Sequence, residues 1–161
     1  MNIYELRLVN GKGTSLIDKE DAEKVILFSW SLKPGRSTNY AQTKIDGKNV
    51  LLHRLILNAP NNKHIDHINC NGLDNRKSNL RFATRSQNRC NTSKVLSKYG
   101  FKGVYFHKDR TSNPWRAYIT SNKKPKTIGY YPTKEAAAKA YDVAAKDMFG
   151  EFAKTNFKES E

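Results

Sequence analysis

Alternation of apolar and polar residues predicts a β-hairpin at the start of the chain. Residues 3–8 mix apolar with charged side chains, the turn formers of residues 10–13 follow, and residues 14–17 are again strand-like. Turn formers between two such runs are typical of a hairpin. Asp18 is then expected to cap a short amphipathic helix, because Asp is a favoured N-cap residue.

A second hairpin is predicted further along. Residues 40–45 and 48–52 are strand-like and flank Asp46-Gly47. Asp-Gly accommodates the positive φ angles of a type I′ turn, which matches the twist of a hairpin. The first fifty residues therefore form a β-rich unit with one helix.

The middle of the chain predicts a compact ββα unit. Residues 65–68 and 80–83 are short apolar runs that can pair as strands, and the Asn- and Gly-rich residues 71–75 between them favour turns. Thr84 and Gln87 then have the spacing of a capping box, with Thr84 as the N-cap. This places Asn88 in the first turns of a helix.

The last sixty residues predict a three-stranded sheet and one helix. Alternating strands are expected over residues 103–107, 115–120 and 126–131, and Thr133 is expected to cap a helix that runs to about Phe149. Its apolar stripe is rich in alanine, so the helix can lie close on one face of the sheet while the other face stays free. The whole chain is predicted to be α+β, with units over residues 1–50, 51–96 and 97–158.

Charge indicates the kind of partner. The 161 residues carry a net charge of +14, and most of the positive charge lies in the last two thirds of the chain. Such a protein attracts polyanions, so nucleic acid is the expected partner. No apolar run approaches the roughly 20 residues that span a bilayer, and the N-terminus is not typical of a signal peptide. We therefore expect a soluble, non-secreted protein with no membrane partner.

Two cysteines leave alternatives open. Cys70 and Cys90 could form a disulfide or half of a zinc site, but the chain has no Cys-x-x-Cys pair. A reducing compartment favours free thiols.

The most informative stretch runs from Asp66-His67 through an Asn-rich loop that is closed by Asn79, to a capped helix carrying Asn88. Carboxylate and amide oxygens suit a hard divalent cation. A neighbouring histidine can take the proton of an attacking water. None of these residues is decisive singly, but their order predicts a nuclease with one metal ion, in which a ββα unit brings Asp66 and Asn88 face to face.

The same residues carry a resemblance to a known family. The run from His53-Arg54-Leu55-Ile56 through Asp66-His67-Ile68-Asn69 and residues 74–81 to Gln87-Asn88 resembles the HNH homing endonucleases of phage introns and free-standing phage genes. The resemblance implies that Asp66 and Asn88 are metal ligands, that His67 is the general base, and that Asn79 braces the loop and so orients His67. Many HNH enzymes have His where this chain has Asn88, and the amide favours Mg²⁺ or Mn²⁺ over zinc.

Other polar residues near this motif have less certain roles. Arg81 and Arg85 are expected to contact phosphate, because the guanidinium fork fits it. His53 could touch the scissile phosphate or pack inside the fold, and packing is the preferred interpretation. No role is assigned to His64.

The C-terminal residues resemble the APETALA2/ethylene-response-factor DNA-binding domain, through motifs at residues 99–105, 115–119, 128–131 and 133–142. Such domains lay a three-stranded sheet into the major groove. Strand alternation gives the candidate contacts on the free face as Lys102, Tyr105, His107, Arg116, Tyr118, Thr120, Thr127 and Tyr130. The plant domains carry arginine at the positions of Tyr105, His107 and Thr120, so their target sequence does not transfer.

Together these features predict a site-specific, divalent-metal-dependent DNA endonuclease of the homing type. It is expected to act on double-stranded DNA as a monomer that nicks, in the cytoplasm of a bacterial host, with no small-molecule cofactor. The alternative is a DNA-binding regulator that uses only the C-terminal unit. The target sequence cannot be read from these residues.

Overall fold

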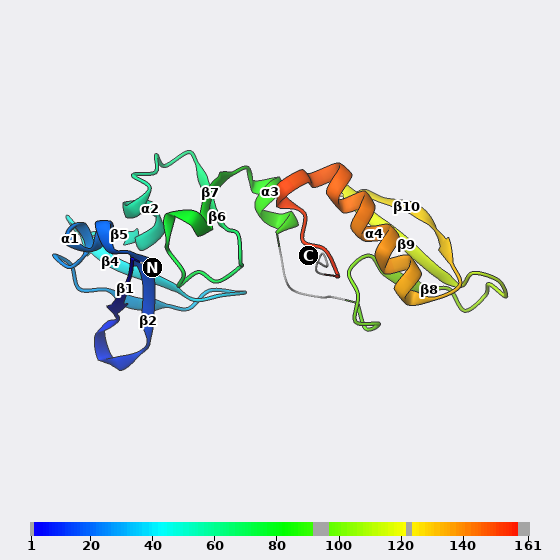
Figure 1. Cartoon of the computed structure of the whole chain (residues 1–161), viewed down its shortest axis with the longest axis horizontal. Helices are drawn as coiled ribbons and strands as arrows, with labels where there is room; N and C mark the ends of the chain where they lie inside the picture. Colours follow the sequence, from blue (N-terminus) through cyan, green and yellow to red (C-terminus); the bar gives the residue numbers. More distant parts are fainter. Residues whose placement is uncertain (1, 92–96, 122–123, 158–161) are drawn as a thin grey trace. The chain divides into compact units, whose positions relative to one another are not determined.

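The computed structural model describes residues 2–91, 97–121 and 124–157 and divides the chain into two compact units, Met1–Arg89 and Cys90–Glu161. Small antiparallel sheets and short helices make up the first unit (Figure 1). A three-stranded sheet packed on one long helix makes up the second unit. The predicted α+β class is confirmed.

Both predicted N-terminal hairpins are present. Strands β1 (Ile3–Arg7) and β2 (Thr14–Asp18) pair antiparallel, as do β4 (Tyr40–Ile45) and β5 (Lys48–Leu51). The turn residues of the second hairpin, Asp46 and Gly47, have φ angles of +48° and +73°, as a type I′ turn requires. A short strand, β3 (Ser31–Lys33), adds to the outer edge of β4.

The helix after β2 differs from the prediction. A 3-10 turn (Lys19–Asp21) leads into α1 (Ala22–Val25), which is only four residues long, and no side chain caps either element. The carboxylate of Asp18 instead accepts a hydrogen bond from the backbone N–H of Lys77, at 2.7 Å. Asp18 therefore joins distant parts of the chain and does not start a helix.

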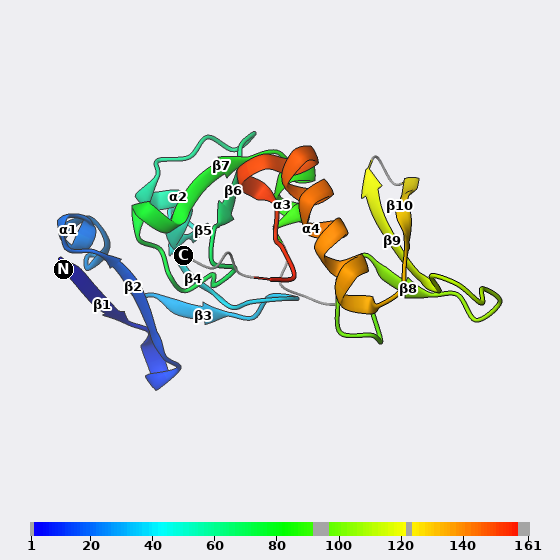
Figure 2. The same cartoon turned by 45° about the vertical axis from the view of Figure 1, so that its right-hand side comes forward.

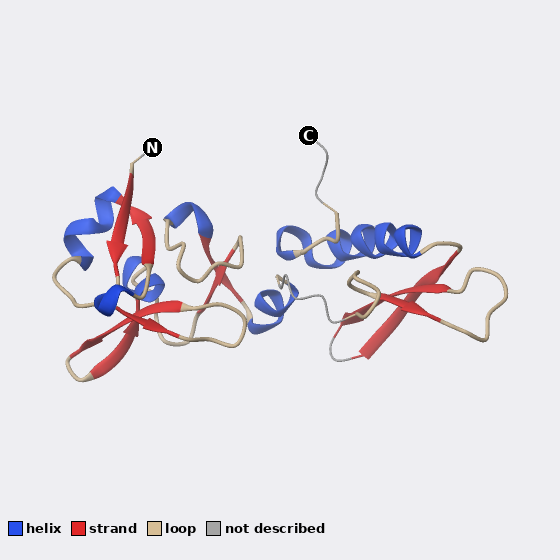
Figure 3. Cartoon of the chain, turned by 90° about the horizontal axis from the view of Figure 1, so that it is seen from below, coloured by secondary structure: helices blue, strands red, loops and turns tan. Residues whose placement is uncertain are grey.

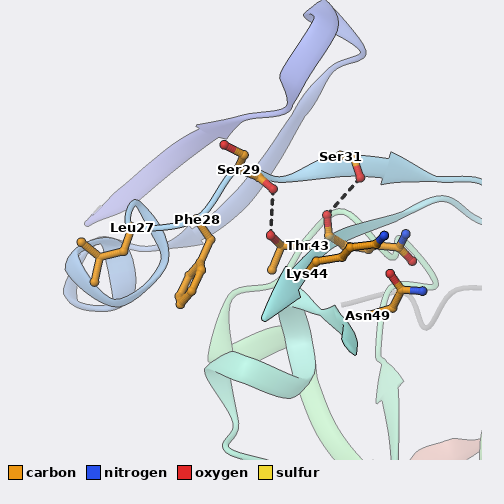
Figure 4. A pocket seen from close by; sticks show the side chains of 8 residues that line it. Leu27, Phe28, Ser29, Ser31, Thr43, Lys44 and Asn49 are labelled. Carbon is orange, nitrogen blue, oxygen red and sulfur yellow. Dashed lines mark hydrogen bonds between the residues drawn. The ribbon is translucent and has the colours of Figure 1, made fainter. Parts of the chain in front are cut away.

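Beside β3 and β4 lies a hollow of about 490 Å³ (Figure 4). Two of its polar side chains are used in backbone contacts: Thr43 Oγ1 donates to the carbonyl of Ser29 at 2.8 Å, and Ser31 Oγ donates to that of Gln42 at 3.1 Å. These bonds tie β3 and the segment before it to β4.

One hydrophobic core contains residues of both predicted ranges, 1–50 and 51–96. It joins Ile17 and Trp30 to Leu52 and Ile56 of α2 (Leu52–Ile56), and to Ile65 of the following hairpin. Trp30 is 1% exposed, and its indole N–H donates to the carbonyl of Val25 at 2.8 Å. The N-terminal elements and the Asp66-His67 segment are therefore packed as one body.

The ββα unit forms as predicted. Strands β6 (His64–His67) and β7 (Leu80–Ala83) pair antiparallel, and α3 (Arg85–Cys90) follows (Figure 2). The capping box is confirmed: Gln87 N donates to Thr84 Oγ1 at 3.2 Å, and Thr84 N donates to Gln87 Oε1 at 2.8 Å. Asn88 lies in the first turn of α3, three positions after its first residue, Arg85, so the cap fixes where Asn88 lies.

In the C-terminal unit, helix α4 (Lys134–Phe149) lies along one side of the sheet (Figure 3). The strand order is β10 (Lys124–Tyr131), β9 (Trp115–Ser121) and β8 (Val104–Phe106). Thr133 caps α4 by accepting from Ala136 N at 3.1 Å, and Gly150 follows the helix with a φ of +53°. Alanines at 137, 138 and 145 are buried, which lets the helix approach the sheet closely.

Gly103 is required where the sheet meets α4. Its φ is +67°, and a Cβ built there would collide with the Tyr141 ring and the Tyr118 carbonyl. We expect Gly103→Ala to lower the free energy of unfolding of this unit by about 1–2 kcal/mol from the left-handed conformation, and by about 1–3 kcal/mol more from overpacking. Gly100→Ala is the matched control, because Gly100 also has a positive φ, of +83°, but open space around its Cβ position. Equal losses in urea denaturation of the two variants would contradict this assignment.

Candidate active site

Asp66 lies in the middle of the ββα unit and is 3% exposed. It is directly opposite Arg81 in the pairing of β6 with β7. The Arg81 guanidinium donates to Asp66 Oδ2 from two nitrogens, at 2.8 and 2.9 Å. Arg81 was predicted as a phosphate contact, and in this structure it neutralises the buried carboxylate.

His67 is the last residue of β6 and is 6% exposed. Its ring Nε2 lies 3.1 Å from Asn75 Oδ1. Burial lowers the pKa of His67 and outweighs the opposing effects of the Asn75 hydrogen bond and of the Asp66 and Asp74 carboxylates. The imidazole is therefore neutral at pH 7, which is the state that can accept a proton.

Asn79 closes the loop between the two strands. Its Oδ1 accepts from Asn69 N at 3.0 Å, and its Nδ2 donates to Asn69 Oδ1 at 3.0 Å and to the carbonyl of Asp74 at 2.7 Å. Its own carbonyl accepts from the N–H of Ile68, the residue after His67, at 2.9 Å. Asn79 thus braces the loop through its backbone and turns, while Asn75 Oδ1 lies within hydrogen-bond distance of the His67 ring.

Asn88 is placed against the same strand. Its Nδ2 donates at 3.1 Å to the carbonyl of Ile65, the residue before Asp66. This bond fixes which end of the amide is the donor and leaves Oδ1 as the oxygen suited to a cation. Arg85, the other predicted contact in α3, is exposed in the first turn of the helix.

Two aromatic rings pack around the candidate base, His67. His53 packs edge-on against His67 with ring centroids 5.0 Å apart, and Tyr40 lies 5.7 Å from His53 and 5.9 Å from His67. Burial, assisted by His67, Arg54 and Lys33, lowers the pKa of His53 to about 3. His53 is therefore a neutral packing partner of His67, while His64 is exposed on β6.

The residues present fit a hard divalent cation. Mg²⁺ is commonly held by one or two protein oxygens, with water and substrate phosphate completing its shell. Asp66 supplies a carboxylate and Asn88 an amide oxygen on neighbouring elements. Within the described ranges no cluster of three or more His, Cys, Asp or Glu side chains is present, and a site with two protein oxygens would not form one.

The C-terminal sheet groups most of the other candidate residues. Pairing of the strands aligns Tyr105, Arg116 and Tyr130 across the sheet, and Tyr118 with Thr127. The Arg116 guanidinium carbon lies 5.3 Å from the Tyr118 ring centroid, and the His107 ring contacts both Tyr105 and Tyr130. Thr120 is exposed on β9, opposite Pro125.

Lys102 is placed differently. It precedes β8, and its ammonium donates to the carbonyl of Lys154 at 3.0 Å, while its backbone N–H donates to Asn156 Oδ1 at 2.6 Å. Lys102 therefore holds the C-terminal segment in place. Its side chain bonds the backbone of the same unit at Lys154.

Three residues close to His67 or to its partners were not among the predicted catalytic side chains. They are Asn75, Tyr40 and Ser15. The sequence places Asn75 in the turn-forming loop and in the run that resembles HNH enzymes, but it gives Asn75 no catalytic role, because the loop contains several asparagines and spacing does not distinguish them. Tyr40 and Ser15 were interpreted as strand residues. Only the contacts between segments that are distant in sequence identify them.

The ββα unit brings together a carboxylate, a neutral imidazole and an amide. Comparison with known proteins identifies the class of protein: residues 50–90 match the family described as HNH endonuclease. The chain is 33% identical to an uncharacterized HNH endonuclease of Acanthamoeba polyphaga mimivirus over 162 residues, covering 96% of this chain and 81% of the relative. The protein belongs to the HNH endonuclease family, which hydrolyses phosphodiesters in DNA and typically uses a divalent metal.

No solved structure matches the chain. None of the helices in the described residues is both long and apolar enough to cross a membrane.

Burial of His53 makes stability depend on pH. The unfolded chain protonates this ring near pH 6.5, while the folded protein does so only near pH 3. The free energy of unfolding should therefore fall as the pH drops from about 6.5 toward 3, by up to about 1.4 kcal/mol per pH unit. We expect His53→Phe to flatten this slope in denaturant titrations, and His64→Phe, at an exposed position, to leave it as in the wild type. An unchanged slope in His53→Phe would show that His53 is not held neutral.

Proposed function

We propose that the protein is a site-specific, homing-type DNA endonuclease that nicks double-stranded DNA with a Mg²⁺ or Mn²⁺ ion held by Asp66 and Asn88. The observation that carries this proposal is the placement of a buried neutral His67 beside Asp66, with Asn88 bonded to the same strand. A bound cation would polarise the scissile phosphate and stabilise charge on the leaving oxygen. A phage origin and action in a bacterial cytoplasm stay predictions.

His67 acts as the general base. It takes a proton from a water molecule as that water attacks phosphorus, and its lowered pKa keeps the ring ready for this at pH 7. Asn79 holds the loop that follows His67, so the backbone directly after the ring is fixed. Arg85 lies on the exposed side of α3, where it can donate to a phosphate.

One metal centre cuts one strand in each binding event. No heptad or long amphipathic surface in the sequence indicates a dimer. A monomer that nicks is therefore the simplest form of the enzyme.

The C-terminal sheet sets where the protein binds, in the manner of the APETALA2-like domain that its sequence resembles. Tyr105 and Tyr130 are exposed on it, and Arg116 lies between them in the strand pairing. Arg116 and His107 are partly exposed beside these rings. Arginine and hydrogen-bonding aromatic side chains suit phosphate oxygens and base edges, so this face supports DNA recognition.

The catalytic assignment predicts that His67→Ala abolishes cleavage and leaves DNA affinity nearly unchanged. A general base contributes about 10²–10⁴-fold to rate and little to binding of the ground state. Plasmid nicking and a binding assay on the same preparations measure both quantities. Asp66→Ala and Asn88→Ala should also be inactive, but through weaker Mg²⁺ binding, which a Mg²⁺ titration detects. Wild-type activity in His67→Ala would refute the mechanism, and unchanged Mg²⁺ dependence in the other two variants would refute the ligand assignment.

The binding assignment predicts a change in salt dependence. If Arg116 contacts phosphate, Arg116→Ala should weaken binding and reduce the slope of log affinity against log salt by about 0.9. Lys139→Ala is the matched control, because Lys139 is an exposed basic residue on α4. Equal salt slopes for the wild type and both variants would remove Arg116 from the DNA interface.

A further inference from the structure

A chain of buried polar side chains links His67 to the N-terminal hairpin. Asn75 and Ser15 are both 0% exposed. Asn75 Oδ1 lies 3.1 Å from His67 Nε2, and Asn75 Nδ2 donates to Ser15 Oγ at 2.7 Å. Ser15 lies on β2 and is 60 positions from Asn75, so the chain crosses from the first hairpin to the candidate base.

The direction of each hydrogen bond follows from the number of protons available. A serine hydroxyl has one proton, and Ser15 donates it to the carbonyl of Leu73 at 2.8 Å. Ser15 Oγ can then only accept from Asn75, so the NH₂ end of the amide faces Ser15. The same NH₂ group is within 3.4 Å of the Gly72 carbonyl, another acceptor. The oxygen end of Asn75 therefore faces His67.

This orientation sets the tautomer of His67. An amide oxygen only accepts, so the ring nitrogen opposite it, Nε2, must carry the proton. A neutral imidazole with a proton on Nε2 has its lone pair on Nδ1. The nitrogen that can act as a base is thus determined before DNA or metal binds.

We propose that Asn75 is a positioning residue that holds His67 as the Nε2–H tautomer, and that Ser15 fixes the orientation of Asn75. The proposal rests on the proposed role of His67 as general base. In that reaction a proton of the attacking water moves to His67 Nδ1, and the water oxygen forms a bond to phosphorus. The bond from phosphorus to the leaving sugar oxygen breaks, and that oxygen takes a proton from solvent.

The backbone around Asn75 keeps this arrangement rigid. Leu16 N donates to the Leu73 carbonyl at 2.8 Å, and Asn75 N donates to the Leu16 carbonyl at 2.7 Å. These bonds dock β2 alongside residues 73–75, with an isolated parallel bridge between Leu16 and Asp74. The first hairpin is therefore part of the catalytic apparatus.

The test uses the full-length protein with ¹⁵N-labelled histidine rings and reads the tautomer of His67 by long-range ¹H–¹⁵N NMR, alongside nicking kinetics. We expect the wild type to have Nε2 protonated. Asn75→Leu should lose this bias and lower kcat by about 10–100-fold, with a much smaller change in KM for DNA. Asn75→Asp keeps an oxygen opposite Nε2, so it should restore the tautomer and most of the lost kcat. Ser15→Ala should give an intermediate effect.

Two variants in the same loop serve as controls. Asn71→Leu changes an exposed asparagine whose Oδ1 accepts from Leu73 N, and Ser78→Ala changes an exposed serine. Both should retain the wild-type tautomer and rate. If Asn75→Leu does not fold, the tautomer of His67 in the wild type and in Asn75→Asp still tests the proposal.

A proton on Nδ1 of neutral His67 in the wild type would overturn the proposal. So would a wild-type tautomer and rate in folded Asn75→Leu. If the NMR result is as expected but His67→Ala cleaves like the wild type, the proposed function fails while the positioning of the ring by Asn75 stands.

Discussion

The first unit depends on satisfying one buried amide. Asn75 is fully enclosed, and leaving a buried polar group without a partner costs about 1–3 kcal/mol. Its side chain is bonded to Ser15, Gly72 and His67, and its backbone N–H to Leu16. These partners come from the N-terminal hairpin, the loop and the end of β6. All of them must be in place together, so the fold of the hairpin and the geometry of the candidate base are set by the same contacts.

The loop between β6 and β7 shows why such contacts are needed. It contains few apolar residues, so burial of hydrophobic surface cannot hold it. Side chains take over this role: Asn79 bonds Asn69 and the Asp74 backbone, and Arg76 forms two bonds to Asp74 at 2.6 and 2.7 Å. A site whose residues must be held within a fraction of an ångström benefits from rigid support. Here that support is polar and comes from several asparagines.

Sequence alone was sufficient wherever the signal is local. Asp46-Gly47 encodes its turn, Thr84 and Gln87 encode the start of α3, and Thr133 encodes the start of α4, because each acts on neighbours within three residues. The capping box likewise places Asn88 in α3, where its side chain donates to the carbonyl of Ile65, next to Asp66. The sequence-based prediction for Asp18 was wrong, because its carboxylate accepts from Lys77 N and does not cap a helix. The contacts of Ser15 with Asn75 and of His53 with His67 were not predicted. These contacts join residues far apart in the chain, and no local periodicity encodes them.

Burial explains how a strongly basic protein can carry a ready general base. Two imidazoles, His53 and His67, pack edge-on and both have lowered pKa values, with burial the largest cause in each case. Placing two charged imidazolium rings in contact, inside a protein of net charge +14, would add repulsion to the cost of desolvation. Both rings are therefore driven to the neutral form, and a neutral His53 can pack against His67 without competing for its proton. The positive charge that attracts DNA is carried mainly by exposed lysine and arginine side chains. The protein can therefore attract DNA while His67 stays neutral and able to accept a proton.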